Sequence, residues 1–487
     1  MHPLVERIPS SVDARALGQL IADRPGAVLL ESARLMSGRG RYSFVAADPF
    51  TTFRSYGSRC EIQSGGLLQT QYGDPWKLLD ALLARCELLE EIDLPFPLGG
   101  CFGFWGYDLK NFVEPKLNRT SFHDLDLPDC AVGFYDSLVV ADHELRESWI
   151  VSTGLDATGA RCSERARAAV EVWVDRLRRL KAINSESRDP TTKAPVSRPL
   201  EFVSSLSREA FIEKVERAQR YIRAGDIYQV NLAQRLTVDE GAPAWGLYQE
   251  LSAVSPAPYA AFFNAGDFSI VSSSPELFLR MSGSHVVTRP IKGTRPRSPD
   301  PLRDAQLGYE LQTSAKEMSE LVMITDLMRN DLGRVCEYGS IHVPELAQLE
   351  RYSHVQHLVS TVEGRLRPGP THLAAFAQCF PGGSITGAPK IRAMEIIEEL
   401  EPVSRGPYTG ALGYLGFNRE TQLSILIRAA LCCPSATHIH VGAGIVADSD
   451  PSAEYEETLA KAAGIQIALQ TVSDAARREA RQTSRLP

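Results

Sequence analysis

A lysine lies at the centre of a proline- and arginine-rich stretch, Thr288–Arg297, TRPIKGTRPR. Pro290 and Pro296 restrict the backbone on either side of Lys292 and keep it out of a helix. Gly293, the next residue, would let the backbone approach a ligand closely. Lys292 is therefore expected on a stiff bend among cations, where its amine could act as a nucleophile. A solvated surface turn is the alternative.

Glutamates recur at helical spacing in two places. Glu317 and Glu320 are three residues apart in one predicted helix. Glu454 and Glu457 are three apart in the last predicted helix, with Lys461 one turn further on. Residues at this spacing share one face of a helix. Mg²⁺ prefers oxygen ligands, so the two pairs brought together would form a magnesium site, whereas apart they are ordinary solvated charges.

Two charged residues lie in otherwise apolar, strand-like segments. Glu276 follows Pro275 in the segment 268–283, where a proline kink would turn its side chain out of a regular strand ladder. Arg428 lies in a strand predicted over 423–431. An arginine there either pairs internally or meets the carboxylate of a ligand.

Small and polar residues near the C-terminus suggest further contacts. Gly442-Ala443-Gly444 closes a predicted strand just before the last helix, where backbone N–H groups could reach an anion. Tyr414 and His357 stand in apolar surroundings, and each is either a ligand contact or a structural residue of the core.

The elements that must position these residues alternate irregularly. Strands of mixed order without a steady βαβ alternation favour an α+β fold over a doubly wound sheet. A polar, proline-bearing segment, 183–199, is the best linker candidate; it divides an N-terminal portion, 1–182, from a C-terminal portion, 200–475, with a frayed tail at 476–487. Strands are predicted at 27–32, 41–49, within 98–108 and 131–152, at 228–236, 268–283, 411–417, 423–431 and 438–446, and helices from Asp74-Pro75, over 159–182, 207–225, 315–332 and 391–400, and from Asp450-Pro451 to about 475.

The composition excludes several classes of protein. The 487 residues are 44% hydrophobic and 23% charged, which is ordinary for a soluble chain, and the net charge of −8 gives no case for nucleic-acid binding. The nine cysteines form no CxxC pair, so a reducing, cytoplasmic setting is expected. Neither a signal peptide nor an apolar stretch approaching 18 residues is present, so no membrane span is expected.

Seven motifs, in one order, resemble those of the chorismate-utilising enzymes, the family of anthranilate, aminodeoxychorismate, isochorismate and salicylate synthases. The resemblance is strong from about residue 206 to 470 and weaker before it. It implies one α+β unit built on two facing antiparallel β-sheets with outer helices, and an active site in the cleft between the sheets. The motifs are SSSPELFL (272–279), RPIKGTRPR (289–297), ITDLMRNDLGR (324–334), HLVSTVEG (357–364), FPGGSITGAPK (380–390), GYLGF (413–417) and GAGIVADSDPSAEYEETLAK (442–461).

The resemblance also indicates a reaction. In that family, lysine at the position of Lys292 is typical of aminodeoxychorismate synthases, whereas anthranilate synthases typically have alanine. Gln229 stands where isochorismate and salicylate synthases have a water-activating lysine, which disfavours hydroxylation by water. The expected reaction is amination of chorismate with ammonia to 4-amino-4-deoxychorismate, for p-aminobenzoate and folate. The alternatives are an anthranilate synthase component that releases pyruvate, and a non-catalytic subunit that binds chorismate or tryptophan.

The resemblance implies a role for each candidate residue. Lys292 would attack C2 of chorismate while Glu276 protonates the departing C4 hydroxyl, and ammonia would then attack C4 and expel the lysine. Mg²⁺ would be held by Glu320 and Glu457, with Glu317 and Glu454 nearby. Contacts with the substrate would come from Gly293, Thr294, Tyr414, Arg428, Gly442, Ala443, Gly444, Lys461, Gln229 and His357.

The resemblance further implies partners. No nucleophilic cysteine with histidine and glutamate partners is recognisable, so a separate glutamine amidotransferase subunit is expected to supply ammonia in a heterodimer. An N-terminal region and the PYA segment correspond to the part of the family that binds tryptophan. The tryptophan hypothesis rests on Ser32, Arg41, Tyr42, Pro258, Tyr259 and Ala260.

Overall fold

The computed structural model describes residues 2–8, 11–32, 40–88, 94–184, 199–352 and 355–483. Most of the predicted linker, 185–198, therefore lies outside the described residues, as does the end of the predicted tail, 484–487. Within the described ranges, no helix is long and apolar enough to cross a bilayer.

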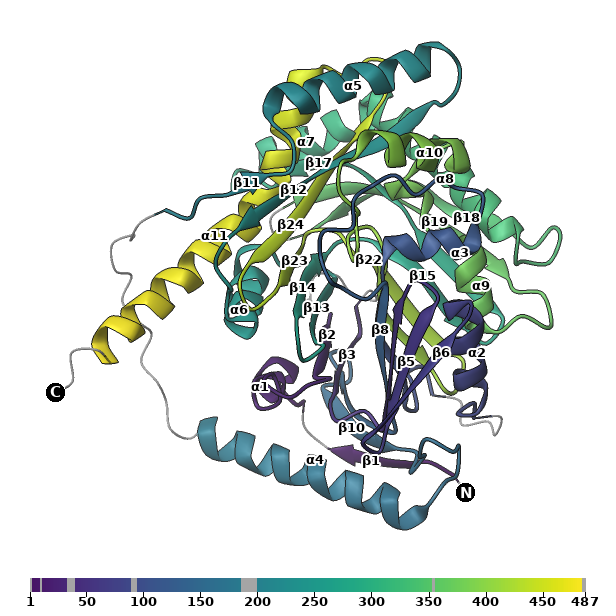
Figure 1. Cartoon of the computed structure of the whole chain (residues 1–487), viewed down its shortest axis with the longest axis vertical. Helices are drawn as coiled ribbons and strands as arrows, with labels where there is room; N and C mark the ends of the chain where they lie inside the picture. Colours follow the sequence, from purple (N-terminus) through teal and green to yellow (C-terminus); the bar gives the residue numbers. More distant parts are fainter. Residues whose placement is uncertain are drawn as a thin grey trace.

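Two antiparallel sheets of twelve strands each form the centre of the described molecule, which confirms the predicted α+β architecture (Figure 1). The first sheet has the order β1-β10-β9-β3-β2-β13-β14-β23-β24-β12-β11, with β20 beside β12. Its strands are β1 (Leu4–Ile8), β2 (Val28–Glu31), β3 (Tyr42–Ala46), β9 (Ser137–Asp142), β10 (Glu147–Ser152), β11 (Val203–Ser204), β12 (Gln229–Val238), β13 (Tyr259–Asn264), β14 (Ser269–Ser274), β20 (Gly387–Ala388), β23 (Ala429–Cys432) and β24 (Thr437–Ile445).

The second sheet has the order β17-β19-β16-β15-β22-β21-β7-β8-β4-β5-β6, with β18 beside β19. Strands from both sides of the predicted linker occur in each sheet, where they form two contiguous blocks that meet at one strand pair, so the two portions of the chain share both sheets. The strands of the second sheet are β4 (Thr51–Tyr56), β5 (Arg59–Ser64), β6 (Leu67–Tyr72), β7 (Gly100–Trp105), β8 (Cys130–Tyr135), β15 (Leu277–Ser282), β16 (His285–Arg289), β17 (Ile291–Pro296), β18 (His342–Arg351), β19 (Val355–Arg365), β21 (Ala411–Gly416) and β22 (Glu420–Ile425).

Helices lie outside the two sheets (Figure 1). Asp74 and Ser207 cap two of them as predicted, because their side chains accept hydrogen bonds from the first backbone N–H groups of the helix. The helices are α1 (Ala14–Gln19), α2 (Pro75–Ala84), α3 (Lys110–Val113), α4 (Ser163–Asn184), α5 (Arg208–Arg223), α6 (Ala244–Val254), α7 (Pro301–Thr313), α8 (Ala315–Gly333), α9 (His372–Cys379), α10 (Lys390–Leu400) and α11 (Pro451–Thr483), with 3₁₀ turns η1 (Tyr107–Leu109) and η2 (Gly383–Ile385).

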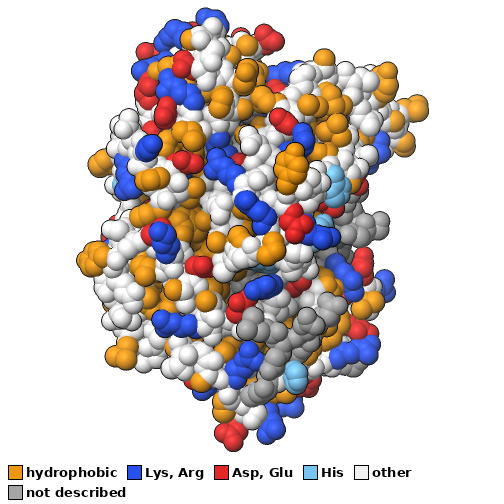
Figure 2. All heavy atoms as spheres, turned by 90° about the vertical axis from the view of Figure 1, so that its right-hand side faces the viewer, with side chains coloured by type: hydrophobic (Ala, Val, Ile, Leu, Met, Phe, Trp, Pro, Cys, Tyr) orange, Lys and Arg blue, Asp and Glu red, His pale blue; other side chains and the backbone are white. Residues whose placement is uncertain are grey.

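The main core lies between the sheets. Phe44 of the first sheet packs edge-on against Tyr414 of the second, with ring centroids 5.0 Å apart, and Phe104 meets Phe263 in the same way. A second core fills the space between the first sheet and its outer helices, around Trp173. Figure 2 shows a different face, the right-hand side of Figure 1, where Lys and Arg side chains are interspersed with Asp and Glu so that neither sign covers it.

Three local expectations were wrong. The chain around Lys292 is not a free-standing bend but strand β17, paired with β19. The single strand predicted over 423–431 is two strands, β22 and β23, which belong to different sheets. The last helix does not end near 475; it continues to Thr483 across most of the predicted tail, because the sequence there contains no glycine or proline that would stop it.

Candidate active site

Two of the places where the chain leaves one sheet and enters the other lie side by side. Pro275 and Glu276 connect β14 of the first sheet to β15 of the second, so the predicted kink is a crossing. Residues 426–428 make the second crossing, from β22 to β23. The Ile425 N–H donates to the Glu276 carbonyl at 3.1 Å, and the Ser273 N–H donates to the Arg428 carbonyl at 3.0 Å. Glu276 and Arg428 are therefore neighbours at these two crossings.

Burial changes the acidity of Glu276. The residue is 6% exposed, and burial raises the pKa of its carboxyl to about 7. The Ser384 hydroxyl, the charge of Lys292, the Ile291 N–H and the charge of Arg428 each oppose that rise. A carboxyl that still carries a proton near neutral pH can donate it to a leaving group.

Lys292 is held by a strand with a bulge. It pairs with Leu358 of β19, and the register shifts between Lys292 and Thr294. Gly293, between them, has φ of 68°, a left-handed conformation that favours glycine. A Cβ atom at Gly293 would lie 2.6 Å from Leu311 and 3.0 Å from a carboxylate oxygen of Glu317. Gly293 is thus packed closely against side chains of α7 and α8, and its predicted approach to a ligand stays a prediction.

The arginines around Lys292 are engaged by acids. Arg289 binds Glu350, and the other two arginines of the motif also bind carboxylates: Arg295 lies 3.4 Å from Glu317 and Arg297 lies 2.8 Å from Asp304. The charge of Lys292 instead acts on the carboxyl groups of Glu276, Glu320 and Glu457. The amine of Lys292 is therefore grouped with these three carboxyl groups and not with a surface cluster of cations.

The two predicted pairs of glutamates lie on α8 and α11, and their charges affect one another. Burial raises the pKa of Glu320, and the charges of Glu317 and Glu454 raise it further. Glu454 in turn is affected by Glu457. Lys292, Lys316 and Lys461 lie among these carboxylates and oppose the repulsion.

The donor set of these four glutamates fits Mg²⁺. All four offer hard carboxylate oxygens, but no group of three or more His, Cys, Asp or Glu side chains in the described ranges lies close enough together to hold a metal ion. Mg²⁺ commonly binds to one or two carboxylates and completes its shell with waters and oxygens of the substrate. The carboxylates therefore have the ligand chemistry that Mg²⁺ uses, and at most two of them could bind one ion in this conformation.

The end of β24 and the start of α11 are tied together beside these carboxylates. Lys461 donates a hydrogen bond to the Gly442 carbonyl at 2.9 Å and lies 2.7 Å from Glu457. A Cβ atom at Gly444 would lie 3.5 Å from the Lys292 amine and 2.9 Å from the side-chain nitrogen of Gln229. The small residues of β24 thus leave open the space that the two polar side chains share.

Gln229 begins β12 and is fully buried. Neither atom of its side-chain amide has a hydrogen-bond partner among the described residues. A buried amide without partners costs free energy unless a ligand or water satisfies it. The amide lies beside Gly444 and the amine of Lys292.

His357 supports the bulge at Gly293. Its Nδ1 lies 3.1 Å from the Gly293 carbonyl and 3.0 Å from the Thr294 hydroxyl. The carbonyl can only accept, so Nδ1 carries a proton. Burial and the charge of Arg428 lower the pKa of His357 to about 4, so the ring is neutral. The structural interpretation of His357 is therefore supported, and its effect is on the segment that carries Lys292.

Comparisons with known proteins show the family of this chain. A model of the chorismate binding enzyme family matches residues 30–466. The chain belongs to that family. Aminodeoxychorismate synthase component 1 of Bacillus subtilis is 36% identical over 471 residues, covering 96% of this chain and 97% of the relative. Anthranilate synthase component 1 of Synechocystis is 38% identical over 471 residues, covering 93% of each. The crystal structure of anthranilate synthase component I from Streptococcus pneumoniae superposes with a TM-score of 0.75 at 30% identity, covering 89% of this chain and 94% of that one.

One residue expected at the site of this chorismate-binding enzyme lies elsewhere. The ring of Tyr414 packs in the core between Phe44 and Phe102. Tyr408 was not predicted, yet its hydroxyl lies 2.9 Å from the position of a Cβ atom on Gly442. The motif GYLGF indicates Tyr414 as a substrate contact, but strand β21 turns its ring into the core. The glycine-flanked context of Tyr408, in RGPYTG, was the signal that could have identified it.

Five of the six residues of the tryptophan hypothesis line a small cavity of about 20 Å³, room for one water molecule. Arg41 does not line it; its side chain binds Asp142 at 2.7 Å. The Ser32 hydroxyl donates to the Pro258 carbonyl at 3.3 Å and closes one side. An indole ring does not fit into this conformation. The cavity is lined by Ser32, Tyr42, Pro258, Tyr259 and Ala260 among others.

Proposed function

We propose that this chorismate-utilising enzyme aminates chorismate at C4 with ammonia to give 4-amino-4-deoxychorismate. The observation that carries the proposal is the presence of Lys292 and the buried acid Glu276 in one electrostatically coupled site beside Arg428. The nucleophile, the proton donor and a cation for a substrate carboxylate are thereby present together. Relatives named aminodeoxychorismate synthase component 1, at 36% and 39% identity, support the same assignment.

The reaction is written in two displacements. The uncharged amine of Lys292 forms a bond to C2, the ring double bonds shift, and the C4–O bond breaks. Glu276 gives its proton to the departing hydroxyl, which leaves as water. Ammonia then forms a bond to C4, the double bonds shift back, and the C2–N bond to Lys292 breaks. The enolpyruvyl group is retained, and Glu276 regains a proton that the incoming amine loses.

The other residues of the cleft bind and orient the substrate. Arg428 supplies a guanidinium for the enolpyruvyl carboxylate. Gln229 supplies a donor and an acceptor beside the amine of Lys292, where ammonia would approach. Mg²⁺ held by Glu320 and Glu457, with Glu317 and Glu454 nearby, would supply positive charge at the ring carboxylate. Lys461 fixes the Gly442 carbonyl next to that end of the ring.

Formation of anthranilate is the second candidate, because a relative named anthranilate synthase component 1 is 38% identical. The purified chain, incubated with chorismate, Mg²⁺ and ammonium, separates the two by mass spectrometry of the products. We expect 4-amino-4-deoxychorismate and no pyruvate. Anthranilate fluorescence together with released pyruvate contradicts the proposal, and absence of any turnover favours a binding subunit.

The covalent step has its own test. Intact-mass spectrometry after exposure to chorismate and Mg²⁺ without ammonia is expected to detect an adduct that peptide mapping places on Lys292. Lys292→Ala removes the adduct and amination together. Lys292→Arg, which keeps the charge but not the nucleophile, is also expected to be inactive. Full amination by either variant excludes the lysine route.

A separate subunit would supply the ammonia. The relatives are named component 1, which supports the existence of a second component. The chain alone is therefore expected to use ammonium and not glutamine. Glutamine-dependent turnover by the purified chain, free of other proteins, contradicts this part of the proposal.

A further inference from the structure

A cavity of about 430 Å³ lies between α2, the start of α9 and two turns of the second sheet. The turns are 283–284, between β15 and β16, and 417–419, between β21 and β22. The residues that line the cavity include none of the candidate residues of the active site. Binding sites for small molecules commonly have volumes of about 300–1,000 Å³, so this cavity has the size of such a site.

The walls of the cavity are largely apolar. Leu83 lines it from α2, Leu373 lines it from α9, and Leu415 and Phe417 line it from the end of β21 and the turn that follows. Walls of this kind favour the hydrocarbon body of a ligand, because contact with them removes apolar surface from water.

The rim of the cavity, 367–371, is held in place. The Arg367 N–H donates to the Val335 carbonyl at 2.9 Å. Prolines occupy two of the next three positions and restrict the backbone there. The Thr371 hydroxyl then donates to the carboxylate of Asp80, on α2, at 2.6 Å. The rim is therefore fixed at both ends, and the cavity is preformed.

His372 joins the rim to the two turns. Its Nε2 lies 2.8 Å from the Gly283 carbonyl, and its Nδ1 lies 2.9 Å from the Thr421 hydroxyl. The carbonyl can only accept, so Nε2 carries a proton and Nδ1 accepts from the hydroxyl. Burial lowers the pKa of His372, which keeps the ring neutral. The imidazole therefore adds no charge to the cavity.

The cavity retains one positive charge that is not paired. Each of its three acids has a partner: Asp80 accepts from Thr371, Glu87 pairs with Arg419, and Glu337 lies 4.0 Å from Arg365. The guanidinium of Arg367, in contrast, makes no hydrogen bond or ion pair with any residue in the part of the chain that the structure describes. It is the group at the rim that is available to an anion from solution.

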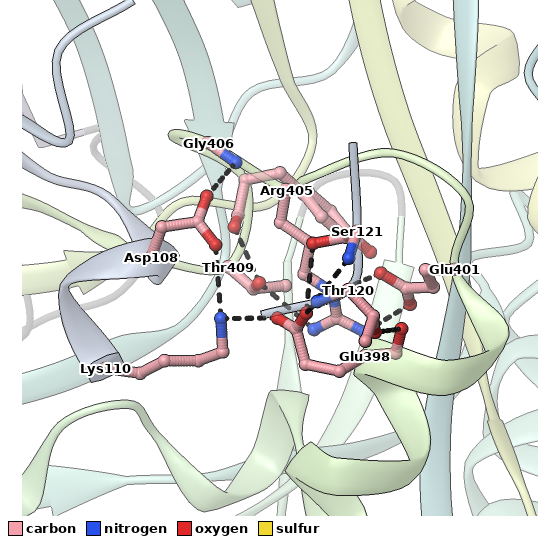
Figure 3. Close-up of polar contacts among 10 residues, drawn as sticks. Asp108, Lys110, Thr120, Ser121, Glu398, Glu401, Arg405, Gly406 and Thr409 are labelled. Atoms are coloured by element: carbon pink, nitrogen blue, oxygen red, sulfur yellow. Dashed lines mark hydrogen bonds and ion pairs between the residues drawn. The ribbon is translucent and has the colours of Figure 1, made fainter. Parts of the chain in front are cut away.

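The buried charges shown in Figure 3 satisfy one another. Arg405 binds Glu401 through two hydrogen bonds, at 2.6 and 2.8 Å, and Lys110 lies between Asp108, at 3.1 Å, and Glu398, at 2.8 Å. Such groups need no ligand. An exposed guanidinium can remain unpaired in water, and it becomes a specific anchor where a preformed apolar wall lies beside it, as it does at this rim.

The cavity lies at the far end of two strands that reach the active site. β15 begins directly after Glu276 and ends directly before Gly283, which lines the cavity. β22 begins directly after Arg419, which also lines it, and ends directly before the crossing at 426–428. Six residues of a strand span about 20 Å. A ligand in the cavity would therefore not touch a substrate beside Glu276.

We propose that this cavity binds a small organic anion that has an apolar body and one carboxylate. The walls receive the apolar body, and the guanidinium of Arg367 receives the carboxylate. An inorganic anion would leave the apolar walls unused, and a neutral hydrocarbon would leave Arg367 unpaired. The inference goes beyond the proposed function and does not depend on which product the enzyme forms.

Isothermal titration calorimetry of the full chain with 2-naphthoate tests the proposal. We expect saturable binding below about 1 mM. 2-Naphthol has the same rings without the carboxylate, and it should bind at least about tenfold more weakly. Arg367→Ala should weaken the binding of 2-naphthoate by about tenfold or more, and Arg367→Lys, which keeps the charge, should retain part of the affinity. Ala84→Trp should abolish binding, because it places a large side chain at the exposed end of α2, where Ala84 lines the cavity.

Arg303→Ala is the matched control, since it removes an exposed arginine of α7 that is paired with Glu310 and does not line the cavity. It should leave the affinity for 2-naphthoate unchanged. Absence of binding at about 1 mM overturns the proposal. Unchanged affinity in both Arg367→Ala and Ala84→Trp places the ligand elsewhere and overturns it too, as does equal affinity for 2-naphthol.

Discussion

The amine of Lys292 and the backbone of Gly444 lie close together although they belong to different sheets: a methyl group on Gly444 would lie 3.5 Å from the lysine amine. Lys292 is on the second sheet and Gly444 is on the first. The distance between them therefore reports how close the two sheets are at the site. It also explains why a residue without a side chain stands opposite the nucleophile.

Gly444→Ala should impair the reaction more than the fold. The atoms that its methyl group meets are the ends of two flexible side chains, Gln229 and Lys292, which can shift. We expect kcat/KM for chorismate to fall by about tenfold or more, with a small change in Tm. Gly413→Ala is the contrast, because its Cβ atom would collide with the backbone of Gln422 and should prevent correct folding. Equal effects on Tm in the two variants would argue against this geometry.

The raised pKa of Glu276 makes both stability and activity dependent on pH. The pKa of this carboxyl is about 7 in the folded protein, so it holds a proton up to about that pH, whereas the unfolded chain loses the proton near the ordinary glutamate pKa of 4.5. The neutral acid therefore contributes stability that is complete below pH 4.5 and is lost as pH rises to about 7. A shift of this size corresponds to about 3 kcal/mol.

Glu276→Gln should separate the two effects. The amide keeps the shape of the carboxyl and cannot ionise, so the variant is expected to be more stable than the wild type at pH 8 but not at pH 5. It should lose most of its turnover at both. Urea unfolding at the two pH values, beside initial rates, measures both quantities. A lower stability of the variant at pH 8 would show that the carboxyl is not neutralised by burial.

Much of the site was predictable because motifs fix local backbone. The position of Lys292 between two prolines and beside Gly293 indicated a restrained amine, and the helical spacing of Glu317 and Glu320 indicated a shared face. These inferences need only a few neighbouring residues. The kink at Pro275 was also visible, since proline cannot continue a strand ladder.

The crossing at Arg428 could not be predicted from local signals. The segment 423–431 is apolar and contains neither glycine nor proline, so it is typical of one strand. Arg428 has φ of 50°, which is uncommon for a residue with a side chain and is held by contacts with the other crossing. The closeness of Tyr408 to Gly442 is likewise a contact between segments that are far apart in the sequence.

Magnesium dependence should map to the glutamates of α8 and α11. Glu320→Gln and Glu457→Gln each remove one charged oxygen ligand, so we expect the Mg²⁺ concentration for half-maximal activity to rise by about tenfold or more. Removal of Mg²⁺ by a chelator should stop turnover, and added Mg²⁺ should restore it. Titration of activity with Mg²⁺ at saturating chorismate measures this. Glu310→Gln, an exposed acid paired with Arg303 on α7, is the control and should not change the requirement.

The buried pair of Arg405 and Glu401 should be costly to break and cheaper to replace. Arg405→Leu leaves the Glu401 carboxylate buried without its partner, and we expect a loss of about 3–5 kcal/mol in unfolding free energy. The double variant Arg405→Leu, Glu401→Leu removes both charges and should recover part of that loss. Urea unfolding of the single and double variants tests the coupling. A double variant no more stable than the single one would contradict it.

Tryptophan is not expected to bind in the conformation described. The cavity around Ser32 and Tyr42 has room for about one water molecule. Equilibrium dialysis with labelled tryptophan should therefore show no retention at micromolar concentrations. Retention that is lost in Ser32→Leu would mean that the cavity opens to admit the indole ring.

The sharing of both sheets between the two portions of the chain has a consequence for dividing the protein. β2 pairs with β13, and β7 pairs with β21, so each sheet is completed by a strand from the other side of the predicted linker. A fragment starting at residue 200 would leave β13 and β21 as unpaired edge strands and should aggregate when produced alone. Produced together, the two fragments should rebuild one enzyme by supplying each other's missing strands.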